Sequence, residues 1–311
     1  VGKKFSLIFT SIVYLAIGPL FALPRTGAVS YSIGVSPHLT EVAQNSWIPL
    51  FLTTLIFFSI TLYLAYNPSK MVDRIGKVLT PALLIVISLL AIKAFLSPMG
   101  EISEAKGAYA TNAFGESFVQ GYLTMDVLGA LVFGIVILQA IQMRGITERK
   151  EQVKISVFAG IIAAIGLSFV YISLAYIGVT SPDATGYFDD GGAILAAASK
   201  VLYGQVGSII LSATIILACL TTAVGLLSAN ASFFAKIFPK ISYQTFLLIF
   251  VVFSFGVSNF GLSKLISISL PVLLIIYPIA IVLMILALIG NVFNHSKFVY
   301  SFAVIVATII R

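Results

Sequence analysis

One carboxylate interrupts an apolar run that carries no other charge. Asp126 lies within residues 117–143, where no second Asp, Glu, Lys or Arg occurs. If this run crosses a membrane, the ionised carboxylate costs at least ~2.5–3.5 kcal/mol unless it meets water, a cation or a donor. Asp126 then either lies on the path of a cation or amine, or caps a helix that restarts after a break. Gly121, Gly129 and Gly134 favour a break, although glycines also let helices pack closely.

A pair of hydroxyl residues lies in a second apolar run. Thr221 and Thr222 occur within residues 201–235, where no residue is charged. Threonine hydroxyls in apolar helices usually bond back to the carbonyl one turn earlier, which needs no further role. The alternative is that a threonine hydroxyl and a neighbouring freed carbonyl bind a small hard cation such as sodium.

A third run contains two prolines and ends at an arginine. Pro19 and Pro24 each lack a backbone N–H and disfavour a straight helix. Arg25 follows directly, and its long side chain can extend along apolar surface toward water. We therefore expect Arg25 to reach the outer membrane interface.

The composition excludes most soluble classes. Of 311 residues, 59% are hydrophobic and only 9% are charged, against about 25% charged in soluble domains. A soluble enzyme, a nucleic-acid-binding protein and a disordered chain are therefore excluded. The single Cys219 forms no internal disulfide, and His38 and His295 lie too far apart in sequence to suggest a zinc cluster. An intramembrane enzyme is disfavoured because only one acid, and no histidine clearly, lies within a span. No phosphate-binding glycine loop of the kind that binds ATP occurs.

The elements that must hold these residues are membrane-spanning helices. A bilayer core needs ~20 apolar helical residues. Nine runs of about this scale occur, the third and fourth interrupted by one charge each and the last ending with the sequence: 5–24, 42–69, 78–99, 117–143, 155–182, 201–235, 241–263, 265–294 and 298–310. They are too long and continuous for barrel strands. The sequence predicts an all-α, polytopic transmembrane helical bundle.

The charges in the connections predict its orientation. Basic residues concentrate on the side of the N-terminus, in segments 70–77, 144–154 and 236–240. Acidic residues concentrate on the opposite side, in segments 101–116 and 183–190. Positive charge favours the cytoplasmic side, so the N-terminal end is expected there. Because the chain starts at Val1 beside a span, we also expect it to be an internal piece of a longer protein.

Four stretches resemble a known family, the bacterial branched-chain amino acid:cation symporters of the BrnQ/LivCS type. They are residues 17–33 (IGPLFALPRTGAVSYSI), 118–147 (FVQGYLTMDVLGALVFGIVILQAIQMRGIT), 218–234 (ACLTTAVGLLSANASFF) and 258–269 (SNFGLSKLISIS). The resemblance implies a LeuT-like inverted-repeat fold of about twelve helices with its site at the bilayer midplane. Residues 1–311 would form one transporter domain, truncated at both ends and running from about the third to the eleventh helix.

The resemblance also implies site residues. The stretch around Thr124, Asp126 and Gly129 would line the substrate pocket in the discontinuous sixth helix. Thr221, through its carbonyl, and Thr222, through its hydroxyl, would bind the coupling sodium. Tyr14 would cover the bound amino acid, unless it is only a packing or interfacial tyrosine. The first helix, which should supply most of the cation and carboxylate contacts, is missing from this sequence.

The expected function is import of leucine, isoleucine and valine by alternating access, coupled to sodium, across a bacterial plasma membrane. The main alternative is coupling to protons with Asp126 as the titrating group, and a channel is a further one. The expected partners are these small molecules and the lipid bilayer, with no nucleic acid. No cofactor is expected beyond the coupling ion, Na⁺ or H⁺.

Overall fold

The structure is a computed structural model that describes residues 3–309 except 67, 103, 189 and 294–295. Over these residues the regular elements are all helices. Six helices are long and apolar enough to span a membrane, and three shorter apolar helices accompany them. These nine match the nine apolar runs one for one, so the predicted all-α, polytopic bundle is confirmed.

The bundle is built in chain order, and several of its spans consist of more than one helical segment. The elements are α1 (Lys3–Leu15), η1 (Ala16–Leu20), α2 (Ala22–Gly34), η2 (Ser36–His38), α3 (Glu41–Gln44), α4 (Trp47–Ala65), α5 (Pro68–Leu96), α6 (Ala108–Gly121), η3 (Tyr122–Thr124), α7 (Asp126–Met143), α8 (Arg149–Thr180), α9 (Pro182–Thr185), α10 (Gly191–Ile237), α11 (Tyr243–Ser258), α12 (Leu262–Leu288), η4 (Gly290–Phe293) and α13 (Lys297–Ile309).

The first span is broken where the sequence places a proline. The π-helical turn η1 separates α1 from α2, and Gly18 within it has non-helical backbone angles (φ −84°, ψ −121°). Pro19 follows and has no N–H to donate to the preceding turn. Pro24 lies in the first turn of α2, where a helix needs no such donor, so it causes no second break.

The tenth helix is the central support of the bundle. It kinks at Gly204, whose φ of +64° is ordinary for glycine, so its membrane-crossing part follows a short outer segment. The helices α2 and α10 pack so closely that a Cβ at Gly34 would lie 2.4 Å from Cγ1 of Ile216. A bond between His38 Nε2 and Ser212 Oγ (2.9 Å) joins η2, which follows α2, to α10 near the outer end.

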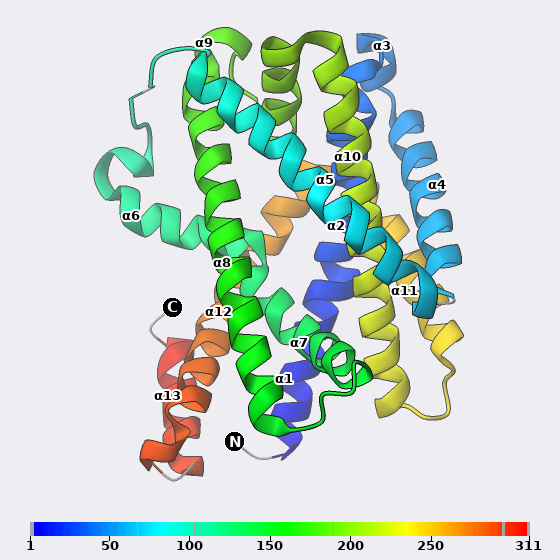
Figure 1. The fold of residues 1–311 in the computed structure, drawn as a ribbon, viewed down its shortest axis with the longest axis vertical. Coiled ribbons are helices and arrows are strands. Elements are labelled where there is room, and N and C mark those ends of the chain that lie inside the picture. The colour runs from blue at the N-terminus through cyan, green and yellow to red at the C-terminus, as the bar shows by residue number, and fades with distance from the viewer. Residues whose placement is uncertain (1–2, 67, 103, 189, 294–295, 310–311) are drawn as a thin grey trace.

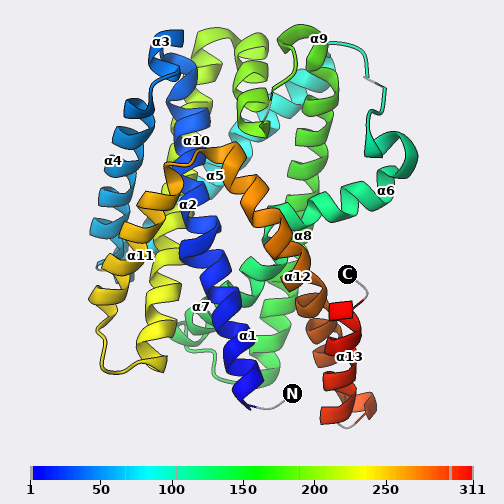
Figure 2. The ribbon, with the colours of Figure 1, turned by 180° about the vertical axis from the view of Figure 1, so that it is seen from behind.

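The two ends of the bundle carry the two predicted sets of connections. Figure 1 places the N-terminus, the loop before α8 and the loop after α10 at one end, with α3 and α9 at the other. Figure 2 shows α1 and α2 crossing the whole height from the first end to the second. At the second end the Asp183 carboxylate accepts from the Glu101 N–H (3.1 Å) and Lys106 Nζ donates to the Tyr187 hydroxyl (2.6 Å). The basic segments 144–154 and 236–240 are therefore separated in space from the acidic loop at 183–190, whereas α6 lies about halfway along the bundle (Figure 1).

Candidate functional site

The span that contains Asp126 is interrupted. Helix α6 ends at Gly121, a single 3₁₀ turn covers Tyr122–Thr124, and α7 begins at Asp126. Met125 joins them with left-handed backbone angles (φ 61°, ψ 14°), the only positive φ of a non-glycine residue among the described ones. Such a conformation is uncommon outside glycine and is held in place by its surroundings. Met125 is buried, which supplies that support.

The interruption leaves backbone groups without partners inside the span. Carbonyls at the end of α6 and N–H groups in the first turn of α7 have no intrahelical partner, apart from local bonds such as Met125 N–H to the Tyr122 carbonyl (3.2 Å). The Thr124 hydroxyl donates to the Gly121 carbonyl at 2.7 Å. The helix ends carry partial charges, negative on α6 and positive on α7. A zwitterion has the charges to match both.

Asp126 is the first residue of α7, but the capping position is Met125 and no side-chain capping hydrogen bond forms there, so the interpretation of Asp126 as a helix cap is not confirmed. A carboxylate there is favourable because it faces the positive end of the helix. It also has a partner from another helix, since the Tyr171 hydroxyl of α8 donates to its Oδ2. The Asp126 side chain is exposed in the described structure, so it remains accessible to a second group.

Arg25 contradicts the expectation that it reaches the outer membrane interface. Its side chain is half-buried, and its Nη1 donates to the Leu123 carbonyl in the 3₁₀ turn at 2.7 Å. The physical reason is that the interruption presents an unpaired carbonyl at the negative end of α6, which is a better partner than a distant interface. The sequence pointed to Arg25, which follows two prolines at the end of an apolar run, but it gave no sign of the partner, because Leu123 lies 98 residues further along the chain.

Two tyrosines complete the surroundings of the 3₁₀ turn. The rings of Tyr122 and Tyr277 of α12 are stacked with centroids 4.5 Å apart. The Tyr277 side chain is only 1% exposed, and its hydroxyl has no hydrogen-bond partner among the described residues. A cavity of about 700 Å³ adjoins this stack, lined by residues including Phe118, Tyr122 and Pro278.

Gly129 lies one turn into α7. A Cβ at Gly129 would meet no atom within 4 Å, so this side of the helix is open. The predicted residues Thr124, Asp126 and Gly129 therefore occupy one turn of 3₁₀ helix and one turn of α-helix. Whether they contact substrate stays a prediction.

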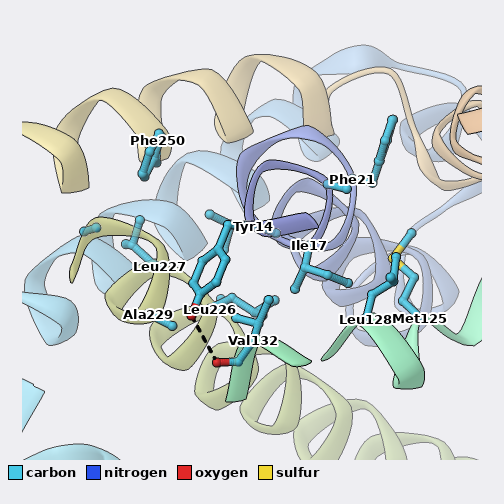
Figure 3. Packing of buried hydrophobic residues seen from close by; sticks show 14 of the residues in the cluster. Tyr14, Ile17, Phe21, Met125, Leu128, Val132, Leu226, Leu227, Ala229 and Phe250 are labelled. Carbon is cyan, nitrogen blue, oxygen red and sulfur yellow. Dashed lines mark hydrogen bonds between the residues drawn. The ribbon is translucent and has the colours of Figure 1, made fainter. Parts of the chain in front are cut away.

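Tyr14 lies in α1 and contacts α7 at Val132, six residues after Asp126. Figure 3 shows it pointing from the first span toward Val132 of α7, where its hydroxyl donates to the Val132 carbonyl at 3.4 Å. It also stacks on Phe233 of α10 with ring centroids 3.9 Å apart. Tyr14 lines a different cavity, of about 410 Å³, between α1, α7, α12 and α13. The packing interpretation therefore describes its observed contacts, and a role in substrate binding stays a prediction.

Thr221 and Thr222 lie on the part of α10 that faces α7. Both hydroxyls donate to the Ala218 carbonyl, at 2.8 and 2.9 Å, which is the back-bonded arrangement. The helix is regular there, its one non-helical residue being Gly204, so no break beside the pair frees a carbonyl. One turn on, Gly225 lies against the Phe133 ring of α7, 3.3 Å from a Cβ built on the glycine. No cluster of three metal-ligating His, Cys, Asp or Glu side chains occurs in the described part of the chain. The sodium assignment stays a prediction.

Comparison with known proteins supplies the family. The family model described as "Branched-chain amino acid transport protein" matches residues 1–311. The chain is 45% identical over 296 residues to the branched-chain amino acid permease BraB of Bacillus subtilis, covering 95% of this chain and 66% of that protein. It is 45% identical over 307 residues to the branched-chain amino acid transport system 2 carrier protein of Pseudomonas aeruginosa, covering 99% and 69%.

A third relative, the permease BrnQ of Bacillus subtilis, is 43% identical over 310 residues, covering 100% of this chain and 70% of the relative. The chain thus spans about two thirds of the length of these relatives. Their names are those of bacterial permeases and carriers, not enzymes, and the apolar helices make the chain a multi-pass protein of the bacterial cell membrane. It belongs to the family of branched-chain amino acid transport proteins.

Proposed function

We propose that this chain is the substrate-binding part of a secondary symporter that imports leucine, isoleucine and valine by alternating access, coupled to sodium. The observation that carries the proposal is the interruption at Tyr122–Met125, with Arg25 and Asp126 on either side of it. Free helix ends in the middle of a span provide fixed dipoles for the charged groups of an amino acid. The relatives' names, which specify branched-chain amino acids, support the substrate class.

The preference among aliphatic substrates follows from the same physics. The side chain of the substrate needs only an apolar pocket, and one methylene changes binding there by only ~1–3 kcal/mol. All three amino acids should therefore be carried with graded affinity. Each coupled positive charge that moves inward adds ~2.3 kcal/mol of driving force per 100 mV, which permits accumulation without ATP. The proposal includes a LeuT-like inverted-repeat fold, with residues 1–311 forming one transporter domain.

The sodium assignment rests on Thr222. A hydroxyl that donates to the Ala218 carbonyl keeps its oxygen lone pairs for a cation. Leucine uptake into proteoliposomes, with sodium present or replaced by choline, tests it. Thr222→Ala should weaken the dependence on sodium concentration, and Thr214→Ala is the matched control because Thr214 is back-bonded in the same way on the same helix. An unchanged sodium dependence in Thr222→Ala would show that the cation binds elsewhere.

Proton coupling remains the second candidate because the hydrogen bond from Tyr171 to Asp126 places an exchangeable proton beside a carboxylate within a span. Uptake driven by an imposed pH gradient without sodium, and abolished by Asp126→Asn, would favour it. Glu116→Gln is the matched control, since Glu116 lies ten residues earlier and accepts a hydrogen bond from Gln120 of its own helix. Saturable uptake that is stimulated by excess leucine on the opposite side would exclude a channel.

A further inference from the structure

The first span has different surroundings on the two sides of its break. On the outer side, α2 packs against α4, α10, α11 and α12, and eight of its thirteen residues are buried. A Cβ at Gly27 would lie 2.7 Å from the Phe58 ring of α4. The Ser254 hydroxyl of α11 donates to the Pro19 carbonyl at 3.4 Å. Such close packing leaves α2 no room to move without breaking contacts, so the outer half is fixed to the bundle.

The inner half, α1, is held by fewer contacts. Among the other helices it packs most on α7, where the Tyr14 hydroxyl donates to the Val132 carbonyl. Leu7, Ile8 and Ile12 are between 44% and 59% exposed. Beside α1 lies the cavity of about 410 Å³, whose other walls belong to α7, α12 and α13. Figure 2 shows α1 and α13 at the same end of the bundle, with α12 next to them. The inner half therefore has space on one side.

The break between the two halves is a place where a helix can bend. The turn η1 is π-helical, Gly18 has non-helical backbone angles, and Pro19 lacks the N–H that would continue the hydrogen-bond ladder. Sharp bends in helices concentrate at prolines and π-turns, because backbone bonds are missing there. A break that joins a fixed segment to a loosely held one has the properties of a hinge.

We propose that α1 and α7 tilt together about Gly18 and Pro19, into the cavity beside α12 and α13, while α2 stays fixed on α10. Val132 is buried, and its bond to Tyr14 joins the two moving helices. The inference deepens the proposed function and rests on it, because the tilt opens and closes the end of the bundle that carries the N-terminus.

The expected displacement grows with distance from the hinge. Phe5 lies thirteen residues before Gly18 in the sequence. At ~1.5 Å per residue it is about 20 Å away, so a tilt of about 15° moves it by about 5 Å. Tyr14 lies four residues before Gly18. The same tilt moves Tyr14 by about 1.5 Å, so its stack on Phe233 of α10 needs only a small adjustment.

The test measures distances between spin labels in the full-length protein in lipid, in a Cys219→Ala background, with and without saturating leucine and sodium. Ile8→Cys of α1 and Leu248→Cys of α11, both exposed, should change their separation by at least about 3 Å. The pair Tyr31→Cys of α2 and Leu248→Cys is the matched reference and should change by less than about 1 Å. The pair Ile8→Cys and Ile137→Cys of α7 should also stay nearly constant, because α1 and α7 move together.

A variant that fills the cavity provides a second readout. Ala287 lines the cavity and is exposed, so Ala287→Trp can be accommodated while it blocks the tilt of α1. Its maximal rate of leucine uptake should fall at least about tenfold, while the Kd for leucine changes less than about twofold, because only the conformational step is blocked. Leu288→Trp at the next position, which is 84% exposed, is the control and should change neither quantity.

The outcomes separate this proposal from the proposed function. If leucine uptake is intact but the distances from α1 and α2 to α11 stay constant, or shift by the same amount, the first span has no hinge and the proposal is overturned. An Ala287→Trp protein that transports as fast as Leu288→Trp would also overturn it. A wild-type protein that takes up no leucine would instead contradict the proposed function.

Discussion

A methyl group added at Gly18 should destabilise the crossing of the first span with α10. A Cβ at this position would lie 2.3 Å from Oδ1, 2.5 Å from Cγ and 2.6 Å from Nδ2 of Asn230. All three distances are far below van der Waals contact. Asn230 cannot easily move away, because its side chain is fully buried and Nδ2 donates to the Leu226 carbonyl at 2.9 Å.

The loss of stability depends on whether the Asn230 side chain moves. If the Asn230 amide rotates, its bond to Leu226 is lost and a buried donor remains unpaired, at a cost of ~1–3 kcal/mol. If it stays, overpacking costs ~1–3 kcal/mol. Gly18→Ala should therefore lower the free energy of unfolding by ~1–3 kcal/mol, which corresponds to a fall in Tm of about 2–5 °C for a chain of this length.

The assay is thermal unfolding of the purified protein in detergent, followed by the fraction that remains monodisperse after heating. Asn230→Ala should rescue Gly18→Ala, because it removes the clashing atoms and the Oδ1 that has no partner. Gly160→Ala in α8 is the control, since a Cβ there meets nothing within 4 Å. A Gly18→Ala protein as stable as the wild type, or a double variant no more stable than Gly18→Ala, would refute this account of the crossing.

Three further results are expected. Tyr14→Phe should leave the Tm almost unchanged because its 3.4 Å hydrogen bond is long, whereas Tyr14→Ala should cost ~3–5 kcal/mol of packing; equal effects would contradict this. Tyr171→Phe and Asp126→Asn should each lower leucine uptake, and the double variant should be no less active than the less active single variant, because the two residues act through one hydrogen bond. Additive losses would mean that the two residues act separately. Met125→Ile should lower the Tm, because a β-branched residue in left-handed conformation costs ~1–3 kcal/mol, and Met125→Leu should lower it less; no difference would mean that the backbone is not left-handed there.

The spans could be predicted from the sequence because the bilayer imposes a length and excludes charge. All nine apolar runs form helices, although α10 begins at Gly191, ten residues before the run that predicts it. Asp190 explains the difference, since its carboxylate accepts from the Ala193 N–H at 2.9 Å and starts the helix. From the sequence, Asp190 was predicted only to lie in an acidic loop, and its role as a helix cap was not predicted.

The site was predictable only in part. Asp126 signalled an interruption, and one occurs directly before it, yet the left-handed residue is Met125 and the nearby glycines Gly129 and Gly134 lie within regular helix. The position of the break depends on contacts between helices, and the spacing of the apolar runs does not reveal these contacts. The partner of Arg25 could not be predicted for the same reason, because its carbonyl acceptor lies 98 residues further along the chain.

The proposed function requires that the helix is interrupted at Tyr122–Met125 and that an amino acid binds at this interruption. The most direct measurement is the rate at which a membrane-impermeant thiol reagent modifies Thr124→Cys in a Cys219→Ala background, with and without leucine. Thr124 is exposed in the break, so the cysteine should react readily, and saturating leucine should slow it at least tenfold. Leu55→Cys, on an apolar face of α4, provides the lipid-facing reference. Reaction at position 124 as slow as at position 55, or a rate that leucine does not change, would contradict the claim.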